Sequence, residues 1–113
     1  MEARANWKYA RITPIKARAM ANEIRGRGVT EVYEMLAIVP RKSADHWKKV
    51  IDSAVANLKV LREGEDVDLD VVFVKDIWAD QGPVWKRWIP RAMGRATRIT
   101  KFTTHLNVIV AER

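Results

Sequence analysis

Apolar residues recur at intervals of three and four in three segments of the first half of the chain, as they do along one face of a helix. These segments span residues 13–26, residues 30–39, and a stretch from position 41 or 42 to about position 62. Thr13 and Thr30 are the predicted N-caps of the first two segments, and the proline after Thr13 is typical of a helix start. We predict three helices, the third being the longest and the axis of the core.

Alternation of apolar and polar residues predicts three strands, at residues 3–12, 67–73 and 98–110. The residues expected to face the core are Ala3, Ala5, Trp7 and Tyr9 in the first strand, Val67, Leu69, Val71 and Phe73 in the second, and Phe102, Leu106, Val108 and Val110 in the third. The fold class predicted is α+β, with three helices packed on a small three-stranded antiparallel sheet in one domain, residues 1–113.

A long β-hairpin arm is predicted at residues 78–100, because the second and third strands would pair while the chain between them goes out and returns. About ten residues each way would carry the arm roughly 30 Å from the core. A lone two-stranded ribbon is marginal in water, and Pro83 and Pro90 each remove a donor from its ladder. Its six cations are expected to face one another at strand spacing and to repel. We therefore predict an arm that becomes ordered against a polyanion.

The charge of the chain is concentrated at its two ends. Residues 1–30 carry seven basic and two acidic side chains, residues 31–80 seven and eleven, and residues 81–113 seven and one, so the net charges of +5, −4 and +6 sum to +7. Residues 82–101 hold six cations and no anion. Such an asymmetry favours a polyanionic partner.

Two tryptophans, Trp85 and Trp88, lie among these cations. Solvated loops rarely carry exposed indoles, whereas unpaired bases stack on aromatic planes, so the pattern favours nucleic acid. Trp47 is assigned to the core, while Trp7 and Trp78 fit either sheet packing or a contact surface. Two other hypotheses for the function stay open: an architectural DNA-binding protein with cationic β-arms, and a membrane-active hairpin.

No catalytic or metal-binding pattern is apparent. Cysteine is absent, which excludes disulfides and thiolate chemistry, and His46 and His105 have no carboxylate partner at a recognisable spacing. The acidic residues between positions 63 and 70 lack the glycine and the ligand order of a calcium loop. No run of eighteen apolar residues is present, so we expect no membrane span and no secretory signal. We predict no enzyme, no cofactor and no metal site.

Three stretches, "ITPIKARAMANEIRGRGV", "PRKSADHWKKVIDSAVAN" and "GPVWKRWIPRAMGRATRITKFTTHLNVIV", resemble in order and spacing the signature regions of the L-twenty-two family of large-subunit ribosomal proteins. The short length is similar to bacterial and organellar members. The resemblance implies a structural protein that binds large-subunit ribosomal RNA, supports its assembly and lines the nascent-peptide exit tunnel with the tip of its hairpin. It implies ribosomal RNA, neighbouring ribosomal proteins and the nascent peptide as partners, a cytoplasmic or organellar ribosome as the location, and no homo-oligomer.

Two sets of functional residues follow from the charge pattern and the resemblance together. The candidate RNA-binding residues are Arg4, Lys8, Arg11, Lys16, Arg18, Arg25, Lys86, Arg87, Arg91, Arg95, Arg98, Lys101 and His105. The residues assigned by the resemblance to the tip in the tunnel are Trp85, Lys86, Arg87, Trp88, Ile89, Pro90 and Arg91.

Overall fold

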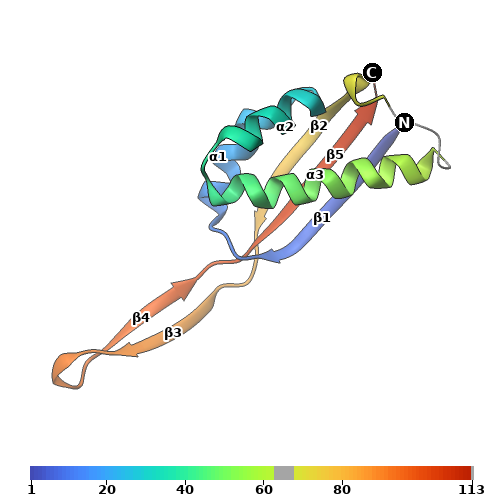
Figure 1. The fold of residues 1–113 in the computed structure, drawn as a ribbon. Coiled ribbons are helices and arrows are strands. Elements are labelled where there is room, and N and C mark those ends of the chain that lie inside the picture. The colour runs from blue at the N-terminus through green and yellow to red at the C-terminus, as the bar shows by residue number, and fades with distance from the viewer. Residues whose placement is uncertain (63–67, 113) are drawn as a thin grey trace.

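The computed structural model describes residues 1–62 and 68–112 of the chain. Three α-helices and five strands lie in this part, which confirms the predicted α+β class (Figure 1). The elements, in chain order, are β1 (Glu2–Ala10), α1 (Pro14–Ile24), α2 (Val29–Ile38), α3 (Lys42–Leu61), the short 3-10 helix η1 (Leu69–Val71), β2 (Val72–Gln81), β3 (Trp85–Pro90), the 3-10 turn η2 (Ala92–Gly94), β4 (Ala96–Lys101) and β5 (Thr104–Glu112).

The main sheet is antiparallel and has the strand order β1-β5-β2. The central strand is β5, whose Val108 is paired with Ala5 on one side and with Ile77 on the other. The helices cover one face of this sheet: α3 packs against β1 and β5, and α1 packs against β2 (Figure 1). The predicted arrangement of three helices on a three-stranded sheet is thus confirmed.

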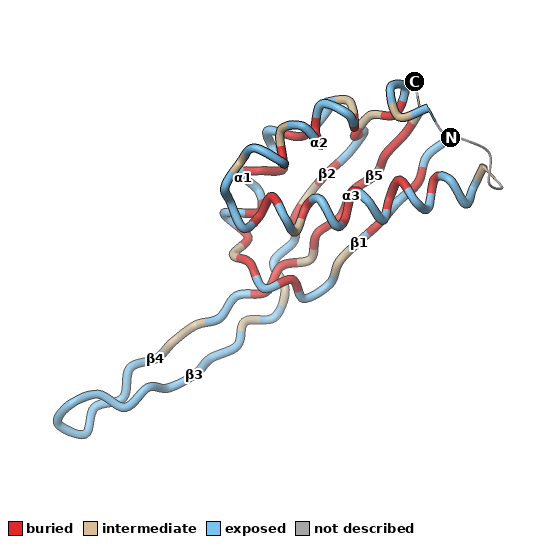
Figure 2. The backbone as a smooth tube through the Cα atoms, in the orientation of Figure 1, coloured by how far each residue is buried: buried red, intermediate tan, exposed pale blue. Residues whose placement is uncertain are grey.

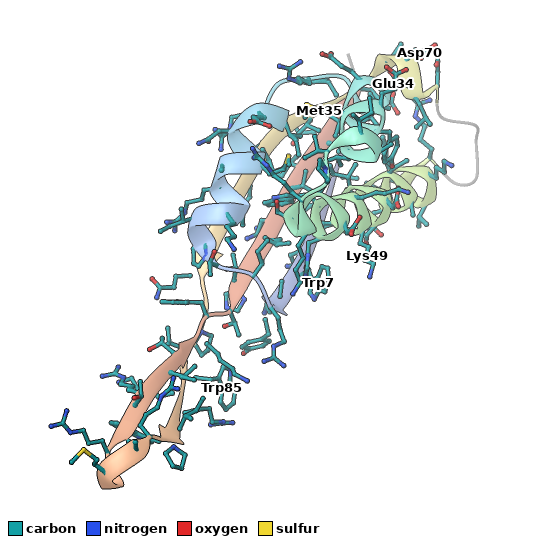
Figure 3. The ribbon with its side chains drawn as sticks, turned by 60° about the vertical axis from the view of Figure 1, so that its left-hand side comes forward. Trp7, Glu34, Met35, Lys49, Asp70 and Trp85 are labelled. Atoms are coloured by element: carbon teal, nitrogen blue, oxygen red, sulfur yellow. The ribbon has the colours of Figure 1, made fainter. Side chains whose placement is uncertain are left out.

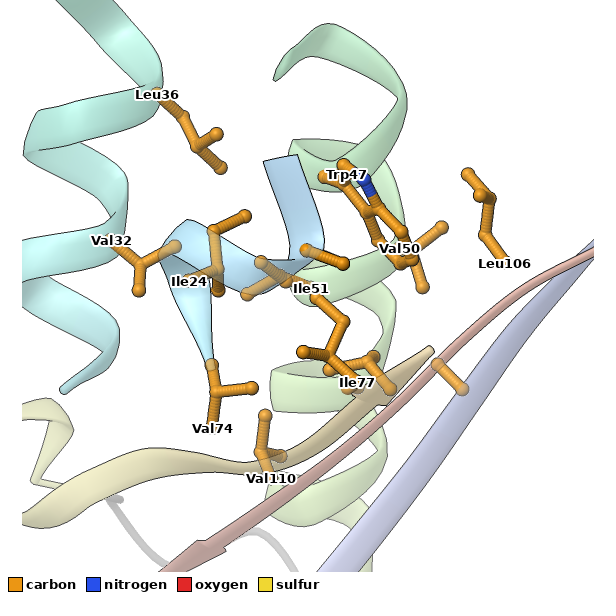
Figure 4. Packing of buried hydrophobic residues seen from close by; sticks show 14 of the residues in the cluster. Ile24, Val32, Leu36, Trp47, Val50, Ile51, Val74, Ile77, Leu106 and Val110 are labelled. Carbon is orange, nitrogen blue, oxygen red and sulfur yellow. The ribbon is translucent and has the colours of Figure 1, made fainter. Parts of the chain in front are cut away.

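The core lies between the helices and this face of the sheet, where the buried residues concentrate (Figure 2). Trp47 on α3 is fully buried among residues of all three helices and the sheet (Figure 4), as its position on the apolar stripe predicts. Its indole Nε1 donates a hydrogen bond to the carbonyl oxygen of Ala17, 3.1 Å away. Because an unpaired buried donor would cost about 1–3 kcal/mol, this bond lets the largest side chain occupy the interior.

The second helix is tied to the third by a polar contact. Tyr33 on α2 is half-buried, and its hydroxyl is hydrogen-bonded to Asp52 on α3. Burial, followed by this hydrogen bond and the negative charge of Asp52, raises the pKa of Tyr33 far above its usual value. The phenol therefore stays neutral and donates to the carboxylate throughout the physiological pH range.

The predicted phase of the second strand is wrong. Strand β2 begins at Val72, so Val72 and Val74 are buried while Val71 is exposed in η1. The ladder with β5 then shifts between Val74 and Asp76, where one extra residue on β2 forms a bulge. The bulge reverses the alternation, and Ile77 becomes the next buried residue. Val67 lies outside the described residues.

Two more residues expected in the core, Tyr9 and Phe102, are 57% and 40% exposed. The register of β1 on β5 shifts between Trp7 and Ala10, and Tyr9 takes a positive φ of 61° there, which turns its side chain away from the core. Phe102 falls in the break between β4 and β5. Both aromatic side chains are displaced at the same place, where the main sheet ends and the arm begins.

The helix ends also differ in detail from the prediction. Thr13 occupies the N-cap of α1 but makes no hydrogen bond with its side chain. The N-cap of α2 is Gly28, so Thr30 lies inside the first turn. Leu61, the last residue of α3, is 52% exposed although the apolar spacing of that segment extends to it.

The arm is a separate two-stranded ladder of β3 and β4, residues 85–101 (Figure 1). It is shorter than the predicted arm of residues 78–100 at its start, because residues 78–81 pair with β5 in the main sheet. The arm gives the molecule a longest dimension of 64 Å and a radius of gyration of 17.3 Å, against about 13 Å for a compact chain of this length. We call the described residues outside positions 82–102 the body.

Candidate nucleic-acid interface

The register of the arm places no cation opposite another cation. Four cationic residues lie in the ladder, and their partners are uncharged: Lys86 is paired with Thr100, Arg87 with Ile99, Arg98 with Trp88 and Lys101 with Trp85. The predicted repulsion between directly facing charges is therefore wrong. Pairing of this kind removes the largest destabilising term from a basic ribbon, because like charges directly opposite each other are the unfavourable case.

The cations are nonetheless spread around the whole arm. Because side chains alternate along a strand, Arg87 and Lys101 lie on one face of the ladder, and Lys86 and Arg98 lie on the other. The remaining two, Arg91 and Arg95, stand at the two ends of the connecting turn. Side chains project from both sides of the arm (Figure 3). A flat anionic surface would meet only one face, so this distribution fits a partner that surrounds the arm.

The tip of the arm is a tight turn at residues 91–95. The backbone N–H of Arg91 donates to the carbonyl oxygen of Arg95 at 2.6 Å, and Met93 and Gly94 both have positive φ, 64° and 72°. This corrects the predicted tip, residues 85–91: Trp85 is paired with Lys101 at the opposite end of the ladder, and the returning strand starts only at Ala96. Met93 is 96% exposed and stands at the extreme end.

Large apolar side chains of the arm are open to solvent. Trp85 is 52% exposed and Trp88 66%, and no residue of the arm is buried (Figure 2). The guanidinium of Arg87 lies 5.8 Å from the centre of the Trp85 ring, in a cation–π contact. Exposed indoles beside cations provide stacking surfaces for bases and charges for phosphates.

Several hydrogen bonds fix the root of the arm to the body. The N–H of Gly82 donates to the Thr103 carbonyl oxygen at 2.9 Å, and Thr103 Oγ1 donates to the Pro83 carbonyl oxygen at 2.5 Å. Next to them, the buried Thr104 Oγ1 donates to the carbonyl oxygen of Ile12 at 2.6 Å. The first two bonds join the strand ends at the root of the arm to each other.

The candidate residues of the body fall into separate groups rather than one face. Arg18 and Arg25 donate to the carbonyl oxygens of Ala79 and Ile77, at 3.1 and 2.6 Å, and so cover the outer edge of β2. An exposed strand edge invites pairing with another chain, so the first role of these two arginines is to protect the sheet. A guanidinium that donates to one carbonyl oxygen of the edge strand retains further N–H donors that can still meet phosphate.

On the sheet face opposite the helices, Arg4 lies over the ring of Trp78, 5.7 Å from its centre. Lys8 is exposed farther along β1. His105 uses Nδ1 to accept a hydrogen bond from the N–H of Tyr9 at 3.1 Å, so this nitrogen is already occupied within the protein.

Arg11 and Lys16 are joined by two cations that are not among the predicted RNA-binding residues. Together with Arg41 and Lys42 they line a cavity of about 480 Å³ between the starts of α1 and α3. Both helix N-caps lack a side-chain hydrogen bond, and the partial positive charge of a helix start adds to that of the side chains. The position of Arg41 and Lys42 at a predicted helix start was the signal in the sequence for a cationic site. The sequence did not show that the start of α1 would lie beside it.

Trp7 and His46 are stacked, with ring centres 4.9 Å apart, and the Lys49 ammonium lies 5.8 Å from the Trp7 ring. Figure 3 shows Trp7 and Lys49 near each other on the body. His46 is also in contact through Nδ1 with the Lys42 carbonyl oxygen, at 2.9 Å. Trp7 is therefore part of the packing between β1 and α3 and is not a free stacking surface.

Residues 1–62 and 68–112 contain no cluster of three or more side chains able to hold a metal ion. Among the helices in these same ranges, none has both the length and the apolar character needed to cross a bilayer. Asp68 accepts a hydrogen bond from the N–H of Asp70 and caps η1.

Comparison with known proteins shows to which family this chain belongs. The model of the family described as ribosomal protein L22p/L17e matches residues 5–111. The chain belongs to this family. Proteins named large ribosomal subunit protein uL22 are 45% identical in Bdellovibrio bacteriovorus and 43% identical in Syntrophobacter fumaroxidans, over 113 residues and the whole of both chains. The same-named protein of Maridesulfovibrio salexigens is 47% identical over 112 residues, 99% of each chain.

Membership confirms the resemblance drawn from the three sequence stretches. The chain is a structural protein of the large ribosomal subunit, located on the ribosome in the cytoplasm, and is not an enzyme. The architectural DNA-binding protein and the membrane-active hairpin considered from the sequence are thereby set aside.

Proposed function

We propose that this chain binds large-subunit ribosomal RNA through its arm, supports the folding of that RNA, and lines the nascent-peptide exit tunnel with the turn at residues 91–95. The observation that supports this most directly is the arrangement of six cations on both faces and the turn of an arm that contains no acidic residue. Phosphates on several sides of the arm would each find a cation within reach.

The energetics of the arm support the same proposal. The arm has no buried side chain of its own, and an isolated two-stranded ribbon is marginally stable. Each phosphate neutralised by the arm would release condensed counterions, so binding would contribute the free energy that packing does not provide. RNA segments that repel one another could then lie close together, which is how the arm would support assembly.

The turn is the part of the proposal that concerns the tunnel. Met93 and the arginines beside it would face the nascent peptide, while Trp85 would stay near the root. The candidate residues Arg4, Lys8, Arg11, Lys16, Arg18 and Arg25 would extend the RNA contact over the body, with neighbouring ribosomal proteins as further partners. The proposal includes no cofactor, no metal and no second copy of the chain.

Ultraviolet crosslinking in cells, followed by sequencing of the attached nucleic acid, tests the proposal. We expect reads from large-subunit ribosomal RNA and crosslinked peptides from residues 85–101. Reads scattered over messenger RNA or chromosomal DNA, without ribosomal RNA, would contradict it. Retention on duplex DNA and on structured ribosomal RNA at matched salt gives the control, since a phosphate contact alone would not distinguish the two.

A further inference from the structure

A cavity of about 420 Å³ lies at the root of the arm, between the end of β1 and the first pair of the β3–β4 ladder. Its volume is within the range of about 300–1,000 Å³ that small-molecule sites occupy. Three aromatic and three cationic side chains line it, and its walls carry no acidic residue. These six residues are Tyr9, Trp85 and Phe102, and Arg11, Arg87 and Lys101.

The aromatic residues come from three different segments, and each keeps a large part of its surface open to solvent. Tyr9 is turned outward by the register shift in β1, Phe102 lies in the break between β4 and β5, and Trp85 begins β3. They are 57%, 40% and 52% exposed. Three large rings that remain open to solvent around one cavity offer a stacking site for a planar apolar group.

The cations of the cavity are free to bind an anion. None of Arg11, Arg87 and Lys101 has an ion pair in the structure, among the residues that it describes. Arg87 makes its contact with the Trp85 ring, so a charge stands directly beside a stacking surface. A ligand with a planar ring and an attached anion matches this combination, and in RNA both belong to a single nucleotide.

The cavity is held open by the bonds at the root. The Gly82–Thr103 and Thr103–Pro83 hydrogen bonds fix the strand ends that carry Trp85 and Phe102. A ligand that enters would therefore lose little free energy in ordering its site.

We propose that this cavity takes one unpaired nucleotide of RNA, with its base stacked among Tyr9, Trp85 and Phe102 and its phosphates held by Arg11, Arg87 and Lys101. The inference rests on the proposed RNA-binding function and adds to it a distinct binding mode: most of the arm meets phosphate, and the root also meets a base.

Binding of two labelled strands to the purified full chain tests this. The first is a single-stranded heptanucleotide of adenosines, and the second is a strand of the same seven phosphates without bases. Stacking of one base predicts that the wild type binds the first strand about 5- to 150-fold more tightly. Trp85→Ala and, as a second variant, Phe102→Ala should bring the ratio of the two affinities close to one. Arg11→Gln should weaken the binding of both strands and leave the ratio unchanged.

Trp78→Ala is the matched control, because it removes an indole from the body that does not line the cavity; it should preserve the ratio. Equal binding of both strands by the wild type, or a ratio that survives Trp85→Ala and Phe102→Ala, would overturn the proposal. If an unlabelled peptide of tyrosine and aspartate displaces the labelled heptanucleotide more strongly than the unlabelled heptanucleotide does, the cavity binds a protein segment and the proposal is wrong. If ribosomal RNA is crosslinked in cells but the two strands bind with equal affinity, only the nucleotide site is contradicted. If no such crosslinks form, the function proposed above is contradicted.

Discussion

The body and the arm are stabilised by different means. In the body, side chains such as Trp47, Ile51 and Leu106 are fully buried, and their burial supplies the main free energy of folding. In the arm no residue is buried, and the two strands have only their ladder and the bonds at the root. One chain thus combines a region that has a buried core with a region that has none.

The body and the arm also differ in how their cationic side chains are neutralised. Three ion pairs bind cations of the body to its own carboxylates: Arg27 with Glu31, Arg62 with Glu112, and Lys75 with Glu2. In the arm, no acidic residue is available to any of the six cations. The body neutralises part of its charge internally, and the arm leaves all of its charge for an external anion.

The largest effect is expected from removing the arm. Replacing residues 85–101 by an Asn-Gly turn keeps the Gly82–Thr103 hydrogen bond and should leave the body folded. Loss of six phosphate contacts should reduce the slope of log K against log salt by about 4 to 5. Between 50 and 200 mM salt, the affinity of the wild type for ribosomal RNA should therefore fall by about 250- to 1,000-fold more than that of the armless chain. Filter binding over a salt series measures this, and circular dichroism checks the body.

An armless chain that binds ribosomal RNA with an unchanged salt slope would show that the body carries the binding. An armless chain that unfolds would contradict the division of the molecule into two regions.

The next largest effect concerns the interior. Trp47→Ala should lower the free energy of unfolding by about 3–5 kcal/mol, because it leaves a large cavity and removes the bond to the Ala17 carbonyl. Trp88→Ala in the arm deletes the same side chain from a 66% exposed position and should change stability by less than about 0.5 kcal/mol. Urea denaturation of both variants measures the contrast. Similar midpoints for the two would mean that the arm shares the core's stability.

Much of the body could be predicted because its signals are local. The helices over residues 14–24 and 42–61 follow from apolar spacing and from their end residues, and Trp47 falls on the stripe that must face inward. The hairpin was predicted because two segments of alternating apolar and polar residues flank a stretch long enough to go out and return. The helix assignments need only neighbours within a few residues, whereas the hairpin required the pairing of two strands that lie far apart in the sequence.

The errors arise where pairing between distant segments decides the outcome. The bulge near Lys75 depends on how β2 aligns with β5, so the phase of the strand before it could not be read from alternation alone. The position of the turn likewise depends on the register that pairs Trp85 with Lys101. The cavity between α1 and α3 brings Lys42 to Arg11, and the root cavity brings Tyr9 to Trp85, across long stretches of sequence.

The smallest expected effect tests the joint between the two regions. A Cβ on Gly82 would lie 2.6 Å from Thr103 Oγ1 and 3.2 Å from His105 Cε1, so Gly82→Ala must displace the threonine that holds the Pro83 carbonyl. We expect a loss of about 1–3 kcal/mol in the free energy of unfolding, because Thr103 is buried and has little room to move. Thr103→Ala removes the clashing oxygen, so the double variant should be less destabilised than the sum of the single variants, by at least about 0.5 kcal/mol. Denaturation of all four proteins gives this coupling energy. Strict additivity would contradict the clash with Thr103 as the cause of the destabilisation. A coupling of the expected sign would show that the joint between body and arm needs a residue without a side chain at position 82.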